Sequence, residues 1–244
     1  QFNESEFNAF LMKHQGLNFL FGYISYDLKN NETKNLKRKT NKIATDDLCF
    51  FSAKNVVIRK GDLCLYYGEE TKETIEQLLS ETAKDQIPGD NCIRLTPGID
   101  RHEYIKNVKS IKENIQHGNI YEMNYCVDFV GTFKSFNAKT TYQSLANNTN
   151  APFSAYLQLN DTIILSGSPE RYIKRLADTL ISQPIKGTAK RGATVKEDVL
   201  IKNELEQNVK EIAENVMIVD LVRNDLSKIA QKNTVEVTEL CKTY

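Results

Sequence analysis

The fold class is decided by the stretch FSAYLQLNDTIILSGSPERYIKRLADTLISQ, residues 153–183, and by the helical pattern after it. Four short runs within this stretch are rich in aromatic and β-branched residues and predict successive strands: 153–159, 162–167, 170–176 and 179–183. The helical pattern is long and spans about 196–228. Because the strands are grouped and the helices come after them, rather than alternating with them, the sequence predicts an α+β fold.

The residues before this stretch add further elements. The apolar spacing predicts the following ones: helices at 3–13, 71–85 and 140–148, and strands at 19–25, 48–52, 56–60, 63–67 and 119–133. One more helix is expected to begin after Asp100, an N-cap with Glu103 at the capping-box spacing, and to end at Gly118.

The charge balance limits the classes of function. The 244 residues include 32 Lys+Arg and 32 Asp+Glu, so the net charge of zero argues against attraction of the whole molecule to nucleic acid or anionic lipid. A basic stretch at 28–42 leaves a non-enzymatic binding or scaffold protein as an alternative, although this stretch carries no aromatic residue for base stacking. No apolar run approaches the ~20 residues of a membrane helix. With no secretory signal visible, we expect a cytoplasmic protein that binds neither membrane nor nucleic acid.

Both ends of the sequence are unusual for a complete protein. Gln1 is not an initiator residue, and Tyr244 follows VEVTEL without a closing helix or polar tail. We therefore expect the chain to begin and end inside a longer protein.

The first stretch that suggests chemistry is SGSPER at 166–171, a polar turn directly after an apolar strand. A carboxylate at such a turn, here Glu170, can serve as a general acid if it is partly buried. The alternative is an exposed glutamate that pairs with Arg171, and the turn by itself favours this alternative.

The second stretch is QPIKGT at 183–188. Pro184 fixes the backbone before Lys186, and Gly187 allows a sharp turn or the close approach of a ligand. The amides of Gly187 and Thr188 can face an anion. This is not a P-loop, because the lysine precedes the glycine. A lysine that caps a turn is the alternative.

The third stretch is KEIAENVMIVDLVRND at 210–225, which is apolar on two faces and predicts a deeply packed helix. Glu211 and Glu214 share a face at i and i+3. A carboxylate on a core-facing stripe needs a cation, and Mg²⁺ suits a site made of oxygen ligands. The alternative is an ion pair of Glu214 with Arg223 or with a neighbouring lysine.

Taken in order, these stretches resemble the chorismate-utilising enzymes. The resemblance runs through YIKNVKSIKENIQHGNIYEMNY, SGSPERYI, PIKGTAKRG and AENVMIVDLVRNDL, and covers roughly residues 97–244. It implies a fold of large antiparallel sheets packed as a sandwich with surrounding helices. It also implies an amino-terminal synthase region at 1–95 and a chorismate-binding domain at 96–244 whose carboxy-terminal part is missing.

The motif PIKGT is similar to that of aminodeoxychorismate synthase component I, whereas anthranilate synthases usually carry alanine at the lysine position. This resemblance implies that Lys186 is a nucleophile on the chorismate ring, Glu170 the general acid, and Glu214 a Mg²⁺ ligand. Substrate contacts would come from Ser168, Gly187 and Thr188. The implied reaction is amination of chorismate at C4 with ammonia from a partner glutamine amidotransferase, in 4-aminobenzoate and folate biosynthesis. Anthranilate synthase component I is the alternative within the family.

One departure from the family pattern concerns Glu122. Water-activating members carry a lysine there and aminating members usually carry glutamine, so the lack of an amine speaks against water as the nucleophile. No role beyond lining the pocket is assigned to Glu122.

Overall fold

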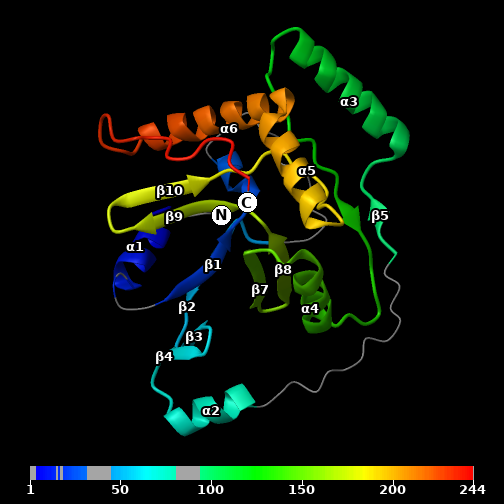
Figure 1. Cartoon of the computed structure of the whole chain (residues 1–244). Helices are drawn as coiled ribbons and strands as arrows, with labels where there is room; N and C mark the ends of the chain where they lie inside the picture. Colours follow the sequence, from blue (N-terminus) through cyan, green and yellow to red (C-terminus); the bar gives the residue numbers. More distant parts are fainter. Residues whose placement is uncertain (1–3, 15, 17–18, 32–44, 81–93, 244) are drawn as a thin grey trace. The chain divides into compact units, whose positions relative to one another are not determined.

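The computed structural model describes residues 4–14, 16, 19–31, 45–80 and 94–243 (Figure 1). Its internal contacts group the chain into two compact units, Gln1–Thr141 and Tyr142–Tyr244, each of which is considered by itself. The sequence-based division at residue 95 stays a prediction. The candidate residues Ser168, Glu170, Lys186 and Glu214 all belong to the second unit.

The first unit contains short helices and three antiparallel strand pairs. Its elements are α1 Glu4–His14, β1 Leu20–Ile24, the 3-10 helix η1 Tyr26–Asn31, β2 Leu48–Ser52, β3 Val56–Lys60, β4 Leu63–Tyr67, α2 Lys72–Ser80, β5 Thr96–Pro97, α3 Arg101–Gln116 and β6 Phe129–Val130, followed by the start of α4 Ala138–Thr149. The pairs are β1 with β2, β3 with β4 and β5 with β6. In the turn between β3 and β4, Gly61 has a φ of 60°.

Helix α3 starts as the sequence predicts. The Asp100 side chain accepts a hydrogen bond from the Glu103 N–H at 2.7 Å, which satisfies one of the free amides of the first turn. The helix ends one residue before the C-cap His117, and Gly118 follows at a φ of 74°.

The strand expected at 119–133 is largely wrong. Only Phe129–Val130 forms a strand, paired with Thr96–Pro97, and residues 121–128 are irregular. A strand requires a partner for its backbone, and this segment instead makes side-chain contacts. The Tyr125 hydroxyl accepts a hydrogen bond from the Asn107 amide of α3 at 2.7 Å. Tyr125 of this segment therefore contacts helix α3, although the segment is not a strand.

The second unit confirms the four predicted strands and contains the end of α4. Its elements are β7 Phe153–Leu159, β8 Thr162–Ser168, β9 Arg171–Leu176, β10 Thr179–Gln183, α5 Val195–Gln207 and α6 Val209–Ser227. Strands β7 and β8 pair antiparallel from Phe153 opposite Ser168 to Leu159 opposite Thr162. Strands β9 and β10 form a second hairpin, with an irregularity between Ile181 and Gln183.

Side-chain contacts hold these elements of the second unit together. The Arg171 guanidinium of β9 lies 4.6 Å from the centre of the Phe153 ring of β7, a cation–π contact between the two hairpins. A Cβ built on Gly167 of β8 would lie 3.1–3.3 Å from Thr149 and Leu145 of α4, so the helix approaches the strand closely there. The connection between the two hairpins, where the motif SGSPER lies, is thus held by contacts on both of its flanking strands.

The single helix expected at 196–228 is in fact two helices, and this is a correction. Asn208 lies between them in an extended conformation, with φ −69° and ψ 111°. Its side-chain oxygen accepts hydrogen bonds from the N–H groups of Lys210 and Glu211, at 3.0 and 3.2 Å. Asparagine is among the strongest N-cap residues, so it starts a new helix at a point where the apolar spacing alone suggested continuation.

Burial is lower than the sequence predicts. Among the described residues the buried hydrophobic ones are Val56, Ile75 and Ala138. No described residue of α6 is fully buried, and its Leu221 is 55% exposed, so the expectation of a deeply packed helix is wrong for this structure. Every sheet in the described residues has two strands, where large sheets packed as a sandwich were expected. The observed fold is a mixture of helices and antiparallel strand pairs.

Two sequence-based expectations concern nucleic-acid binding and membrane insertion. The basic stretch 28–42 lies largely outside the described residues, so its interpretation as a binding surface stays a prediction. Within the described part of the chain, no helix combines the length and the apolar character needed to cross a membrane.

Candidate active site

The turn between β8 and β9 presents Glu170 to solvent. The Ser168 hydroxyl accepts a hydrogen bond from the Glu170 N–H at 3.2 Å and also lies 3.3 Å from the Glu170 carbonyl oxygen, which closes the turn. Glu170 does not pair with Arg171 as the alternative supposed, because Arg171 donates to the Gln183 side chain at 2.8 Å. The expected desolvation of Glu170 is not observed, since this residue is exposed.

The Glu170 carboxylate lies beside the segment that carries Lys186. Its Oε1 accepts a hydrogen bond from the Ile185 N–H at 3.4 Å. Residues 184–194 connect β10 to α5 without helix or strand. The Ile185 N–H is therefore satisfied by the Glu170 side chain and not by the backbone hydrogen bonds of a sheet. Lys186, the next residue, is half-buried. The structure therefore brings the motifs SGSPER and QPIKGT together.

Gly187 lies against the first turn of α6. Its φ of 77° is in the left-handed region, which favours glycine. A Cβ built on Gly187 would lie 2.8 Å from Oε2 and 3.3 Å from Cβ of Glu211. The absence of a side chain thus lets the backbone next to Lys186 touch a carboxylate. Thr188, which follows, is exposed.

Glu211 and Glu214 converge on one cationic group. The Lys210 ammonium lies 3.5 Å from Oε1 of Glu211 and 3.1 Å from Oε1 of Glu214. The hydrogen bond that Lys210 donates to Glu214, together with the charges of both carboxylates, raises the pKa of Lys210. This is the ion pair with a neighbouring lysine that the alternative described; Arg223 pairs with Asp220 instead. Both carboxylates are about one-quarter exposed, whereas Lys210 is 74% exposed.

The donor set of this pair suits Mg²⁺. Proteins usually bind Mg²⁺ through one or two carboxylates, with water and substrate oxygens completing the shell. Glu211 and Glu214 already place oxygens within 3.5 Å of one cation, so they fit this pattern. The described residues contain no cluster of three or more His, Cys, Asp or Glu that would enclose a metal by itself. A metal held here would therefore share its shell with substrate or water.

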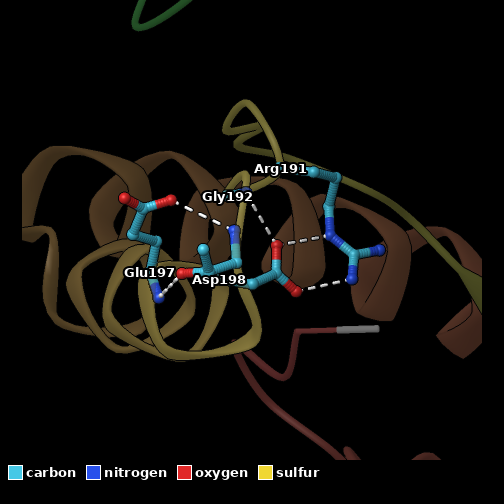
Figure 2. Close-up of polar contacts among 5 residues, drawn as sticks. Arg191, Gly192, Glu197 and Asp198 are labelled. Atoms are coloured by element: carbon cyan, nitrogen blue, oxygen red, sulfur yellow. Dashed lines mark hydrogen bonds and ion pairs between the residues drawn. The ribbon is translucent and has the colours of Figure 1, made fainter.

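The segment that bears Lys186 is anchored a second time at its far end. Figure 2 shows Asp198, in the first turn of α5, facing Arg191 and Gly192. Its carboxylate accepts hydrogen bonds from Arg191 Nε at 2.6 Å and from the Gly192 N–H at 2.9 Å. The hydrogen bond from Arg191 has the larger effect and that from the Gly192 N–H the next; together they lower the pKa of Asp198 from 3.8 to about 2. Sequence reasoning missed both Arg191 and Asp198.

The structure brings part of the predicted set together and adds Arg191 and Asp198. Glu170 and Gly187 make contacts that involve the segment bearing Lys186, and Ser168 closes the turn that presents Glu170. Glu214 pairs with Lys210 within α6, and the residue of α6 that contacts the segment is Glu211. Glu211 was noticed only as a neighbour of Glu214, and its contact with Gly187 could not be read from spacing. The sequence did contain a signal for Asp198. An acidic side chain in the first turn of a helix can reach back to positively charged and N–H groups just before the helix, here Arg191 and Gly192. Glu122 belongs to the other unit.

Comparison with known proteins identifies the family of the chain. The sequence matches the family described as chorismate binding enzyme over residues 1–244. The chain belongs to the chorismate-binding enzyme family.

Individual members of the family are moderately similar to this chain. Aminodeoxychorismate synthase component 1 of Klebsiella aerogenes is 36% identical over 140 residues, which cover 57% of this chain and 31% of that protein. Aminodeoxychorismate synthase, chloroplastic, of Arabidopsis thaliana is 33% identical over 246 residues, covering 90% of this chain and 26% of that protein. The chain therefore spans less than a third of the length of these two relatives.

A solved structure supports the fold. The crystal structure of anthranilate synthase component I from Streptococcus pneumoniae TIGR4 superposes with a TM-score of 0.71 at 22% sequence identity. The match covers 91% of this chain and 52% of the solved one. The helices and hairpins described above thus correspond to about half of that fold.

Proposed function

We propose that this chain is part of a Mg²⁺-dependent, cytoplasmic enzyme that aminates chorismate at C4 to 4-amino-4-deoxychorismate. The observation that carries the proposal is the contact between the Glu170 carboxylate and the Ile185 N–H, which places a carboxyl group beside the residue that precedes Lys186. The similarity to aminodeoxychorismate synthases supports the same choice. As in a component 1, ammonia would come from a partner glutamine amidotransferase, and the product would serve 4-aminobenzoate and folate synthesis.

In the proposed first step, the neutral amine of Lys186 forms a bond to a ring carbon of chorismate. The ring double bond shifts, the C4–O bond breaks, and the hydroxyl leaves as water after taking the proton of Glu170. Hydroxide is a poor leaving group, so this proton is needed. The partial exposure of the site in this chain means that exclusion of water must come with bound substrate or with other parts of the protein.

In the proposed second step, ammonia forms a bond to C4 and the bond to Lys186 breaks, which returns the neutral amine. The aminated product gives its extra proton to Glu170, which restores the acid. Ser168, Gly187 and Thr188 are proposed to bind substrate through hydroxyl and amide groups. Their position supports this, because all three belong to the turn and segment that meet at Glu170.

Glu214 and Glu211 are the residues proposed to hold Mg²⁺, which when bound would neutralise and orient a substrate carboxylate. In this state Lys210 would leave its place between the two carboxylates. The exposed side chain of Lys210 can move without disrupting packing.

The two-stranded sheets are proposed to be parts of larger sheets of the family sandwich. The superposition on about half of a solved relative supports this view. It also supplies a reason for the many apolar side chains that are exposed on the hairpins, such as Ile173 and Leu176 of β9.

The test is a product assay on the purified protein with chorismate, Mg²⁺ and ammonia. The proposal predicts 4-amino-4-deoxychorismate. It also predicts that Lys186→Ala lowers the rate by about 1,000-fold or more, because a covalent step needs its nucleophile. Lys190→Ala, an exposed lysine of the same segment, is the matched control and should keep the rate. Formation of anthranilate and pyruvate would favour anthranilate synthase component I, and neither product would reject a chorismate-aminating enzyme.

A further inference from the structure

Residues 184–194, the segment that carries Lys186, are tied to the second unit at both ends. At the first end, the Glu170 carboxylate accepts the Ile185 N–H. At the other end, the Asp198 carboxylate accepts the Gly192 N–H and two hydrogen bonds from Arg191, from Nε at 2.6 Å and from Nη2 at 2.5 Å. Two carboxylates thus hold a stretch that has no helix or strand.

The attachment at the second end is close as well as charged. A Cβ built on Gly192 would overlap the Asp198 nitrogen and would lie 2.7 Å from the Glu197 carbonyl carbon. These are backbone atoms of a helix, which cannot move aside. The chain therefore passes directly against the first turn of α5, and only glycine fits at this position.

The turn that receives the segment is itself rigid. Thr194 and Glu197 form a complete capping box, in which the Glu197 N–H donates to the Thr194 hydroxyl at 3.3 Å and the Thr194 N–H donates to the Glu197 carboxylate at 3.1 Å. Figure 2 shows Glu197 beside Asp198 at the start of the same helix. The capping box fixes the backbone from which the Asp198 side chain reaches back.

We propose that Arg191 and Asp198 are positioning residues that hold the segment 184–194, so that Lys186 stays in the stretch whose preceding residue, Ile185, is bound by Glu170. An arginine fork on a carboxylate fixes direction as well as distance, and the Gly192 N–H adds a third bond to the same carboxylate. With both ends fixed, Lys186 has fewer conformations to lose when it reacts. The catalytic part of this proposal rests on the proposed function, whereas the restraint on the segment does not.

The competing account is an ordinary surface ion pair, since such pairs contribute little to stability. Arg191 is 85% exposed, which is typical of such a pair, but Asp198 is only 28% exposed. Lys202 and Glu206 form an exposed ion pair on the same helix, 3.8 Å apart. Lys202→Ala is therefore the matched control for the loss of a surface ion pair from α5.

The experiment compares Arg191→Ala, Arg191→Lys and Lys202→Ala with the parent protein by hydrogen exchange and by steady-state kinetics. In Arg191→Ala, the amides of 185–192 should exchange about tenfold faster, because one anchor of the segment is lost. In the same variant, kcat should fall about tenfold while KM changes less than about twofold, as expected when a nucleophile is displaced but binding groups remain. Arg191→Lys should recover part of both effects, because lysine makes one of the two bonds.

The outcomes separate the two proposals. If the amides of 185–192 exchange at the same rate in Arg191→Ala as in Lys202→Ala, the restraint is absent and the inference is overturned. Equal losses in kcat for Arg191→Ala and Lys202→Ala would also overturn it. If the parent protein makes no 4-amino-4-deoxychorismate but exchange in 185–192 still accelerates, the proposed function fails while the restraint on the segment stands.

Discussion

The first turns of α5 and α6 are alike in sequence and different in what their carboxylates do. Each helix starts at a polar cap, Thr194 for α5 and Asn208 for α6, and each turn brings an acidic side chain to the segment that bears Lys186. In α5 the Asp198 carboxylate is committed to Arg191 and a backbone N–H. In α6, Glu211 and Glu214 face an exposed lysine and a glycine backbone.

The difference shows how neighbouring helix ends take different roles. Fixed donors from the backbone and an arginine fork hold a carboxylate in one place, which suits it to structure. An exposed ammonium that can be displaced leaves a carboxylate pair able to accept another cation, which suits the pair to a metal. We therefore propose that α5 restrains the segment and that α6 holds the metal.

The largest expected effect concerns the metal and separates the two helices most clearly. Glu214→Gln should weaken Mg²⁺ binding in the presence of chorismate by about 100-fold, because it removes a charged ligand. Asp198→Asn should change the Mg²⁺ affinity by less than about twofold, since that carboxylate has other partners. Isothermal titration calorimetry measures both, and equal losses in the two variants would abolish the division of roles.

Gly187 gives a sharper view of the contact between the segment and α6. Gly187→Ala places a Cβ 2.8 Å from the Glu211 carboxylate in the left-handed region. We expect a loss of about 1–2 kcal/mol in the free energy of unfolding from backbone strain, and a weaker Mg²⁺ affinity as Glu211 shifts. Gly118→Ala is the control, because Gly118 has a φ of 74° and no atom within 4 Å of its Cβ position. Urea unfolding compares the unfolding free energies of the two variants. A loss of Mg²⁺ affinity in Gly118→Ala would contradict a specific effect of the contact between Gly187 and Glu211.

The N-cap of α6 should matter for both stability and metal binding. Asn208→Ala removes the acceptor for two amides and should lower the free energy of unfolding by about 1 kcal/mol. Because fraying of this turn moves Glu211, the variant should also weaken Mg²⁺ binding. Thr194→Ala, the equivalent change in α5, should cost similar stability without loss of Mg²⁺ affinity, and the opposite pattern would reverse the assignment of the two helices.

The smallest effect is a pH dependence in α5. The pKa of Asp198 is lowered from 3.8 to about 2 by Arg191 and the Gly192 N–H. A lowered folded-state pKa adds stability that is present above pH ~4 and is lost as the pH falls toward ~2. The difference in unfolding free energy between the parent protein and Asp198→Asn should therefore shrink over this window. A difference that stays constant from pH ~5 to pH ~2 would show that charge on Asp198 does not stabilise the fold.

Local patterns predicted the elements well where a single residue type controls geometry. The four strands of 153–183 and the Asp100 cap were predictable, because strand alternation and capping depend on neighbours in sequence. The break at Asn208 was not predicted, because apolar spacing continues across it while the side chain caps the backbone. The irregular segment 121–128 was missed for a related reason, since its Tyr125 packs on Tyr104 of α3 while the segment does not pair as a strand.

The residues of the candidate site were proposed from sequence motifs, and their contacts could be predicted only in part. The motifs pointed to Lys186, Glu170 and Glu214, but nothing in their spacing indicates that Glu170 meets the Ile185 N–H. The contacts of Glu211 and Asp198 depend on where α6 and α5 begin, which is set by caps and by the turn at Gly187. Long-range contacts of this kind follow from the fold and not from local sequence.

The central claim is that Lys186 forms a bond to the substrate, and peptide mass spectrometry tests it most directly. The protein is mixed with chorismate and Mg²⁺ without ammonia, quenched and digested. We predict that the peptide containing Lys186 gains the mass of chorismate less one water, in the parent protein and in Lys190→Ala but not in Lys186→Ala. An unmodified Lys186 peptide in a preparation that makes 4-amino-4-deoxychorismate once ammonia is added would contradict the claim.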